Sequence, residues 1–271
     1  MMRQMIAATG NAEKMVEIRQ ILAGSGIELE TMKDAGLELE IVENGSTFEE
    51  NALIKARAVA QASGKMAIAD DSGLVVDAMG GEPGIHSARW MGHDTSYEIK
   101  NREIIRLVDA YCAKKETESA YIQPENVAGG TGMPLQQENA AGGTRMPLQQ
   151  DHAAGGTGMP LQQDHTAGGT CEAAVHPGCL WDKTPGPLRS ARFVCAVAVV
   201  WPDGRERTAT GVLEGRIHTK QCGKNGFGYD PIFYLPEYGM TSGQIPREEK
   251  NRISHRGQAF RKIRKILEEE A

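Results

Sequence analysis

The sequence predicts an α/β protein whose mixed central sheet is flanked by helices. Near the N-terminus, a short apolar run at residues 4–8 leads into a helical pattern in which Met15, Ile18 and Leu22 share one face. Towards the C-terminus, residues 193–201 form a long apolar run, and a Pro-Asp-Gly turn returns the chain as a second strand. Strands and helices alternate at first and an antiparallel pair follows, so we expect a sheet of mixed direction.

Shorter patterns predict the remaining elements. Residues 37–41 alternate between apolar residues and glutamate, which predicts a strand with one exposed face. Thr47 and Glu50 have capping-box spacing at the start of a helix that runs to about residue 62. The later elements, in order, are strands at residues 66–69 and 74–79, a helix at 96–111, strands at 193–201, 206–213 and 232–234, and a final helix after Ser254 that ends near 267.

Length and charge limit the classes of function. The chain has 271 residues, 40% apolar and 24% charged, which suffices for one domain or two small ones with a real core. A net charge of −6 and a pI near 5.7 argue against a general nucleic-acid or acidic-membrane binder, although a local cationic cluster still permits a small anionic ligand.

The cysteine pattern and the lack of long apolar segments indicate the cellular compartment that we expect for the protein. The five cysteines are irregularly spaced, and the N-terminus shows no long apolar stretch of the kind found in signal peptides. No apolar run approaches the roughly 18 residues that a transmembrane helix needs. We therefore expect a reduced, cytoplasmic protein that does not bind membranes.

Residues 116–188 differ from the rest of the chain. Ala-Gly-Gly-Thr recurs at Ala128, Ala141, Ala154 and Ala167, which is a step of 13 residues. Each unit offers little more than one methionine and one leucine to bury, which cannot offset the entropy of ordering its backbone. We expect a disordered low-complexity insert at 116–188, with residues 1–115 and 189–271 forming a single domain.

Two adjacent acids are the strongest candidate site. The apolar run at residues 67–69 ends in Asp70 and Asp71, followed by Ser72 and Gly73. Side chains alternate along a strand, so the two acids should leave it in different directions. Adjacent buried carboxylates require a cation or hydrogen-bond donors. One interpretation is a divalent-metal site for phosphate chemistry, and the other is a strand end with a polar turn.

Two further segments carry groups suited to phosphate. Residues 9–14, Thr-Gly-Asn-Ala-Glu-Lys, join a strand to a helix, where free backbone N–H groups attract phosphate and Lys14 adds charge. A plain turn is the alternative, because the segment is not a Walker loop. Glu50 is either a helix-capping residue or a metal-facing carboxylate. Lys55, five residues further along that helix, is either a phosphate contact or a solvated charge.

Two C-terminal segments carry groups suited to a nucleobase. Residues 225–231, Asn-Gly-Phe-Gly-Tyr-Asp-Pro, can present an aromatic ring for stacking and Asp230 as an acceptor, or form a tight turn with its rings in the core. Lys250, His255 and Arg256 can donate to base carbonyls or phosphate, or they are surface charges behind an N-cap at Ser254.

The joint order of six motifs is more specific than any one of them. The motifs are residues 9–14, 47–52 (Thr-Phe-Glu-Glu-Asn-Ala), 70–74 (Asp-Asp-Ser-Gly-Leu), 81–89 (Gly-Glu-Pro-Gly-Ile-His-Ser-Ala-Arg), 227–231 (Phe-Gly-Tyr-Asp-Pro), and 247–257 with its Arg-Glu-Glu-Lys and Ser-His-Arg-Gly. In this order they closely resemble the Ham1/RdgB family of inosine/xanthosine triphosphate pyrophosphatases, over about residues 4–113 and 190–267. The family normally has a short connection where this chain carries the insert.

The resemblance implies a fold, an activity and a set of site residues. It implies a Maf/Ham1-like fold of two lobes with an active-site cleft, and a homodimer. It also implies Mg²⁺-dependent hydrolysis of ITP, dITP and XTP to the monophosphate and pyrophosphate. Asp71 would be the catalytic proton acceptor and a metal ligand, with Glu50 as a second metal ligand. The implied substrate-binding residues are Thr9, Gly10, Asn11, Ala12, Glu13, Lys14, Lys55, Ser72, Phe227, Gly228, Tyr229, Asp230, Lys250, His255 and Arg256.

Three alternatives stay open on the sequence alone. A related Maf-like pyrophosphatase for other bases would differ only in the base-reading residues. A non-catalytic nucleotide sensor would keep the fold without turnover. The repeat could instead be a partner-binding tract carried on a passenger domain.

Overall fold

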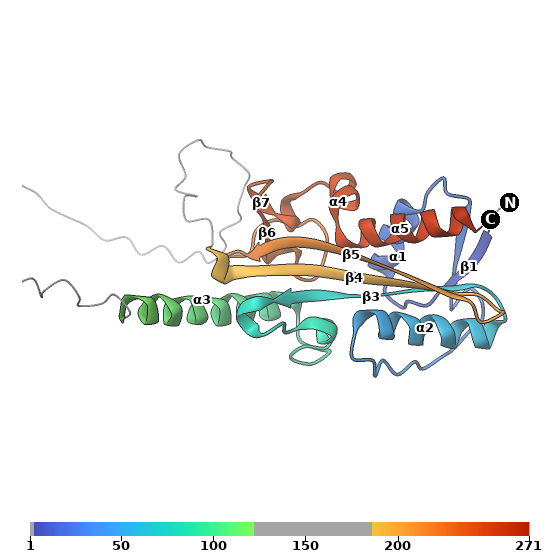
Figure 1. Ribbon diagram of the computed structural model, residues 1–271, viewed down its shortest axis with the longest axis horizontal. Coiled ribbons are helices and arrows are strands. Elements are labelled where there is room, and N and C mark those ends of the chain that lie inside the picture. The colour runs from blue at the N-terminus through green and yellow to red at the C-terminus, as the bar shows by residue number, and fades with distance from the viewer. Residues whose placement is uncertain (1–2, 122–185, 271) are drawn as a thin grey trace, which may run out of the picture.

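A seven-stranded mixed sheet organises the chain in the computed structural model, which describes residues 3–121 and 186–270 (Figure 1). The strands are β1 (Arg3–Ala7), β2 (Ile27–Thr31), β3 (Ala67–Val76), β4 (Ser190–Val200), β5 (Glu206–Ile217), β6 (Phe233–Leu235) and β7 (Met240–Thr241). Their order across the sheet is β2-β1-β3-β4-β5-β6-β7. Only β1 pairs in parallel, with β2 and β3, and every later pair is antiparallel. The predicted mixed α/β sheet is confirmed.

Helices cover the sheet and divide it into two lobes joined by β3, β4 and β5. The α-helices are α1 (Ala12–Ile21), α2 (Phe48–Ser63), α3 (Tyr97–Tyr121), α4 (Arg247–Ile253) and α5 (His255–Glu269). Figure 1 shows α5 and α1 above the long strands, α2 below them near the chain termini, and α3 at the other end with β6 and β7. The first lobe therefore holds α1, α2 and α5, and the second holds α3, β6 and β7.

Three apolar clusters form the core of these lobes. The first lobe has one cluster on each face of the sheet. Met5, Ile68 and Val197 belong to the cluster under α1 and α5, and the small residues of α2 pack on the opposite face. The second lobe is centred on buried Phe233 and Ile104. Because the two lobes have separate cores, the long strands between them carry polar residues without disrupting either one.

The structure contradicts the predicted strand end at the two acids. β3 is continuous, and each residue from Ala67 to Val76 has a partner on β4, including Asp70 opposite Val197 and Asp71 opposite Ala196. The polar residues stay within the strand because cations on both faces of the sheet meet the carboxylates. The turn predicted at Ser72 and Gly73 is therefore wrong, whereas the expected divergence of the two acids is confirmed by their separate partners.

The predicted strand at residues 37–41 is also wrong. The edge strand is β2, and residues 37–45 have no regular secondary structure. The alternation has a different origin. Leu37 and Ile41 pack against the apolar cluster of α2, while Glu38 and Glu40 face solvent. Leu39, the third apolar residue of the pattern, is exposed, so the alternation does not correspond to one fully buried face.

Other elements agree in position and differ in length. α1, α2 and α5 match their predicted positions, with Asn11, Thr47 and Ser254 as N-caps. α3 continues to Tyr121, ten residues past its predicted end at Tyr111. β2, β7 and α4 were not anticipated from the sequence. Most of the predicted 116–188 insert lies outside the described residues, so its disorder and the domain division stay predictions.

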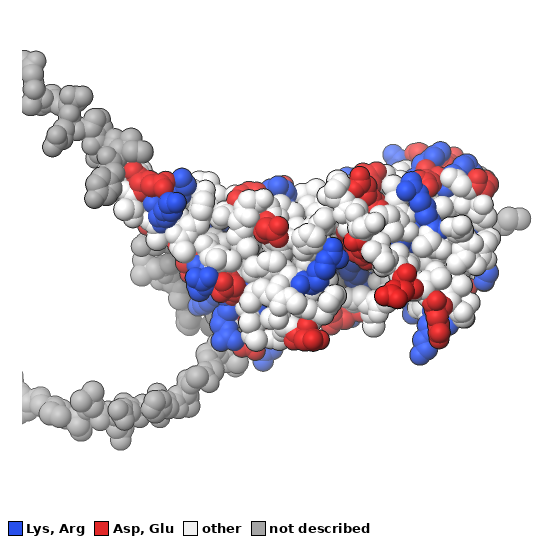
Figure 2. Space-filling model, turned by 90° about the horizontal axis from the view of Figure 1, so that it is seen from below, with Lys and Arg blue, Asp and Glu red and all other residues white. Residues whose placement is uncertain are grey.

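Surface charge is mixed on the side that carries α2 and α3. Figure 2 shows blue and red groups interspersed among uncharged residues, without a large region of one sign. This agrees with the modest net charge of −6. In the described part of the chain, no helix is long and apolar enough to cross a lipid bilayer.

Close packing of α5 on β5 generates the first prediction. A Cβ at Gly211 would lie 2.1 Å from the backbone oxygen of His255 and 2.7 Å from the amide nitrogen of Ala259. The helix would have to move, because backbone atoms cannot yield as a flexible side chain does. We expect Gly211→Ala to cost about 2–3 kcal/mol of unfolding free energy, measured by urea denaturation.

The matched control for this prediction is Gly186→Ala. A Cβ there meets nothing within 4 Å, and its φ of −53° suits any L-residue. Equal stability of the two variants would contradict the proposed tight contact between α5 and β5.

Candidate active site

The site lies where β1 stops short beside β3. These strands pair only through Ile6 with Ala67 and Ala7 with Ile68, so the edge of β3 beyond Ile68 has no neighbouring strand on that side. A cavity of about 390 Å³ opens along this edge, within the size range of small-molecule sites. Its walls come from both lobes, so groups from the two ends of the chain face one space.

The cavity brings together most of the residues that the sequence singled out. Those that line it are Thr9, Gly10, Asn11, Lys14, Lys55, Asp71, Ser72, Phe227, Gly228, Tyr229, Asp230, Lys250, His255 and Arg256. Three predicted residues do not line it, namely Ala12, Glu13 and Glu50. The carboxylate of Glu50 instead accepts hydrogen bonds from the amide and hydroxyl of Ser46, at 2.6 and 2.7 Å. Its assignment as a metal ligand stays a prediction.

Asp71 projects from β3 towards α2. Its Oδ1 lies 3.6 Å from Nζ of Lys55, and the same Nζ lies 3.0 Å from a carboxylate oxygen of Glu43. Burial raises the pKa of Asp71, and the negative charge of Glu43 adds to this, while Lys55 and Lys14 oppose it. A carboxylate whose pKa is raised in this way is better matched to accepting a proton near neutral pH than an exposed aspartate is.

Asp70 projects to the other face and stays ionised. Nζ of Lys14 lies 3.0 Å from its Oδ2, and Nε of Arg256 lies 3.5 Å from the same oxygen. Burial raises the pKa of Asp70, but Lys14, Arg256 and Lys55 outweigh it and hold the pKa below its usual value. Asp70 does not line the cavity, so it acts as a buried counter-charge that fixes two cations in the wall.

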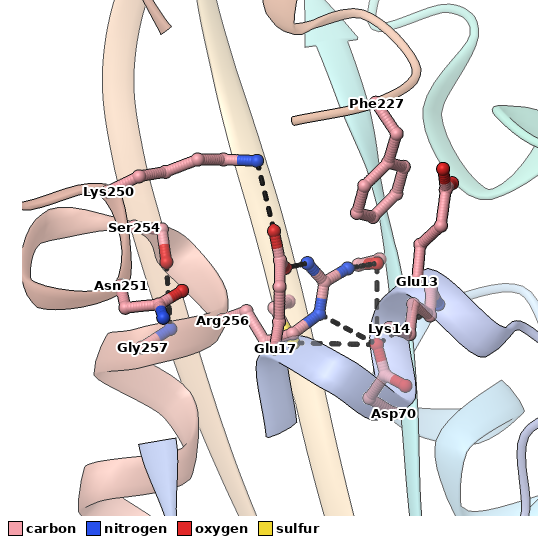
Figure 3. A network of polar contacts seen from close by, with 12 residues as sticks. Glu13, Lys14, Glu17, Asp70, Phe227, Lys250, Asn251, Ser254, Arg256 and Gly257 are labelled. Carbon is pink, nitrogen blue, oxygen red and sulfur yellow. Dashed lines mark hydrogen bonds and ion pairs between the residues drawn. The ribbon is translucent and has the colours of Figure 1, made fainter. Parts of the chain in front are cut away.

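Glu17 of α1 completes this cation network, and the sequence analysis missed it. Its side chain is 8% exposed and lies between Lys250 and Arg256 (Figure 3). One oxygen is 3.1 Å from Nζ of Lys250, and the other accepts a hydrogen bond from Nη1 of Arg256. Burial raises the pKa of Glu17, but the two cations more than offset this and lower it. The sequence signal that could have identified Glu17 is its place three residues after Lys14 on the same helix.

Phe227 forms an aromatic wall beside these cations. Its ring centroid lies 5.2 Å from Nζ of Lys250 and 5.6 Å from Cζ of Arg256, and Figure 3 shows the ring directed at the guanidinium. The ring of Tyr229 stands edge-on to that of Tyr97, which also lines the cavity, with centroids 5.1 Å apart. A flat ring flanked by fixed cations is suited to a planar, electron-rich heterocycle.

His255 sits at the start of α5 and is neutral. Its ring stacks on that of Phe193, with centroids 4.8 Å apart, and burial together with the neighbouring cations Arg256 and Lys250 holds its pKa well below the usual value. Its Nδ1 is buried and has no hydrogen-bond partner among the described residues. Because His255 lines the cavity, this ring can offer a hydrogen bond to a ligand.

Asp230 and Asn11 line the cavity but are engaged with the protein itself. The carboxylate of Asp230 accepts from the amide of Phe227 at 2.8 Å, from the hydroxyl of Ser242 at 2.8 Å and from Lys250 at 2.7 Å. Asp230 therefore holds the loop that presents Phe227. Oδ1 of Asn11 accepts from the amides of Glu13 and Lys14 at 2.9 and 3.0 Å. Two of the N–H groups expected to be free for phosphate are thus already capped.

The structure also adds cavity residues that the sequence analysis did not assign. Glu43 comes from the irregular segment, Arg89 and Ser87 from the loop after β3, and Tyr97 from the start of α3. Arg89 and Ser87 fall inside the 81–89 motif, which was the available signal for them. Nothing in the local pattern distinguished Glu43 from the other acids nearby.

A pair of carboxylates fits a divalent metal ion. No three histidine, cysteine, aspartate or glutamate side chains are grouped to bind a metal within residues 3–121 and 186–270. Mg²⁺, however, is usually held by one or two carboxylates together with substrate phosphates. Glu43 and Asp71 already hold one cation, Lys55, between them at the cavity wall. These two acids therefore fit the metal better than Glu50 does.

Curated relatives match the chain from end to end. A dITP/XTP pyrophosphatase of Listeria monocytogenes serotype 4b (strain F2365) is 36% identical over 270 residues, covering 99% of this chain and 96% of the relative. A dITP/XTP pyrophosphatase of Bacillus subtilis (strain 168) is 32% identical over 267 residues, covering 98% of each. These relatives confirm that the chain is an enzyme of the predicted class.

Solved structures share the fold. A HAM1 protein from Coxiella burnetii superposes with a TM-score of 0.66 at 27% identity, and the Staphylococcus aureus Ham1 protein superposes with a TM-score of 0.61 at 27% identity. Each comparison covers 99% of this chain and all of the other. The Ham1 family itself matches residues 5–130 and 174–266, which include every group described in the cavity. The chain therefore belongs to the Ham1 family.

Proposed function

We propose that this enzyme hydrolyses the non-standard purine nucleotides ITP, dITP and XTP to the nucleoside monophosphate and pyrophosphate, with Mg²⁺ as cofactor. One observation carries the proposal: a carboxylate pair and a wall of fixed cations with an aromatic ring face the same cavity. The names of the relatives, dITP/XTP pyrophosphatase, support the same substrate class. The homodimer and the cytoplasmic location stay predictions.

The base would lie against Phe227, with Lys250, His255 and Arg256 along its edge. Hypoxanthine and xanthine carry an oxygen at position 6 that accepts from these donors, whereas adenine carries an amino group there. Adenine would leave buried donors unpaired, which can cost on the order of 10³-fold in kcat/KM. The position of His255 in the cavity wall supports a ligand-facing role for that ring.

The triphosphate would lie between the 9–14 loop and α2. Lys14 and Lys55 would neutralise its non-bridging oxygens, and Asp71 would accept the proton of a water molecule attacking the α-phosphorus. The bond that breaks joins the α-phosphorus to the bridging oxygen, which leaves with pyrophosphate. Bound Mg²⁺, held by Asp71 and Glu43, would supply charge neutralisation on the phosphates.

Asp71→Asn tests the proton acceptor. We expect pyrophosphate release from ITP to fall about a thousandfold or more, because an amide neither accepts the proton nor carries the charge. Monophosphate and pyrophosphate are quantified chromatographically over a panel of ITP, dITP, XTP, ATP, dTTP and UTP.

Asp77→Asn is the matched control, since Asp77 follows the same strand and pairs with Ser190 and Arg192 outside the cavity. Preferred turnover of dTTP or UTP by the wild type would instead favour a Maf-like enzyme. No turnover of any nucleotide would favour a sensor.

Glu43→Gln tests the proposed metal pair. The loss of one carboxylate should raise the Mg²⁺ concentration needed for half-maximal activity by about tenfold, within the range seen when metal-site groups are altered. Glu40→Gln lies on the same segment with its side chain exposed and should leave this concentration unchanged. Identical Mg²⁺ curves for both variants and the wild type would exclude Glu43 as a ligand.

Glu17→Gln tests the buried counter-charge of the base-reading cations. We expect KM for ITP to rise about tenfold, because Lys250 and Arg256 lose the group that fixes them. Unfolding provides a second measurement. The pKa of Glu17 is lowered below the value of 4.5 assumed for the unfolded chain, so its stabilising contribution is present above pH 4.5 and is lost as the pH falls further.

The variant should therefore lose less unfolding free energy than the wild type between about pH 5.5 and pH 3.5. Glu28→Gln, on the edge strand β2, serves as the exposed control. Parallel pH dependence of stability in Glu17→Gln and the wild type would refute the buried ion pairs.

A further inference from the structure

The irregular segment that carries Glu43 is held by side chains of α2. Within the described chain, no backbone-to-backbone hydrogen bond involves residues 38–44. Instead, Asn51 accepts from the amide of Gly45 at 2.8 Å, Glu50 accepts from Ser46, and Lys55 pairs with Glu43. The position of Glu43 therefore depends on polar side chains from the first two turns of one helix.

Asn51 also contacts Asp71, as Lys55 does, but it donates a hydrogen bond to the other carboxylate oxygen. Its side chain is 0% exposed, and its Nδ2 donates to Oδ2 of Asp71 at 3.2 Å. The amide orientation is dictated by chemistry, because the N–H of Gly45 requires an acceptor and an ionised carboxylate requires a donor. Asn51 and Lys55 thus both join the segment that bears Glu43 to Asp71, and Asn51 does so by hydrogen bonds to a backbone amide and to Oδ2.

The two oxygens of Asp71 are restrained by different groups. Oδ1 accepts from the amide of Ser72 at 3.1 Å and faces Lys55, while Asn51 supplies the one hydrogen bond to Oδ2 among the described residues. Without Asn51 the carboxylate is restrained through Oδ1 alone, and Oδ2 loses its hydrogen-bond donor. The contact with Gly45 is also close, since a Cβ on Gly45 would lie 2.7 Å from Oδ1 of Asn51.

We propose that Asn51 is a positioning residue that fixes the carboxylate of Asp71 and the Glu43 segment relative to one another. The inference rests on the proposed function, in which these two acids share the metal and Asp71 takes the proton. Asn51 does not line the cavity, so it acts through its two partners and not through the substrate. Its loss should therefore lower kcat far more than it changes KM.

Two substitutions separate the two contacts. Asn51→Asp keeps an acceptor for the N–H of Gly45 and replaces the donor to Asp71 with a carboxylate oxygen. Asn51→Leu removes both contacts while keeping a side chain branched at the same carbon atom. Arg57→Gln is the control on α2, because Arg57 is exposed and pairs with Glu206 away from the cavity.

Kinetics with ITP and hydrogen exchange without metal or nucleotide provide the measurements. We expect both Asn51 variants to lose about a hundredfold in kcat with KM within about threefold of the wild type. Exchange at the Gly45 amide should accelerate about tenfold or more in Asn51→Leu and stay within about threefold in Asn51→Asp. The control should match the wild type in both measurements.

Three outcomes would overturn the inference. The first is a kcat within threefold of the wild type in both variants. The second is a loss of melting temperature alone with kcat intact, which would assign Asn51 a purely structural role. The third is unchanged exchange at Gly45 in Asn51→Leu. If Asn51→Leu does not fold, Asn51→Asp still decides the kinetic part. A wild type that releases no pyrophosphate refutes the proposed function separately, and the exchange comparison then decides whether Asn51 anchors Gly45.

Discussion

The alternation of side chains along β3 is the constraint on which the site depends. Two neighbouring acids in one continuous strand must enter opposite faces of the sheet, and both are buried there. Burial of a carboxylate is unfavourable without a compensating cation, so each face needs its own partners. Lys14 and Arg256 meet Asp70 on one face, and Lys55 meets Asp71 on the other. The two acids of β3 therefore fix the positions of these cations in the cavity wall.

The two acids have the same chemistry and different environments. The cations around Asp70 lower its pKa by more than burial raises it. The carboxylate therefore remains ionised. Asp71 shares Lys55 with Glu43, so burial prevails and its pKa is raised. Divergent pKa values of neighbouring carboxylates are a common sign of distinct roles in an active site. Here one acid organises the wall, and the other has the properties required of a proton acceptor.

Local patterns predicted the parts of the fold that local physics controls. The caps at Thr47 and Ser254 depend on neighbours within three residues, and the apolar runs of β1 and β4 determine their own burial. Residues 37–41 were misassigned because an alternating pattern alone does not reveal whether a sheet, a helix or solvent covers its apolar side chains. The turn at Ser72 and Gly73 was wrong because pairing with β4 overrode the local preference of those residues.

Long-range contacts explain what could not be predicted in the site. Glu17 looks like an ordinary helical acid until Lys250 and Arg256 approach from the far end of the chain, 239 positions away in the case of Arg256. The same separation has a consequence for biosynthesis. A nascent chain emerging from the ribosome holds Glu17 long before Lys250 and Arg256 are translated, so this acid lacks both counter-charges in water until α4 and the start of α5 are made. The cation wall, and any turnover that depends on it, can arise only after Lys250 and Arg256 have been translated.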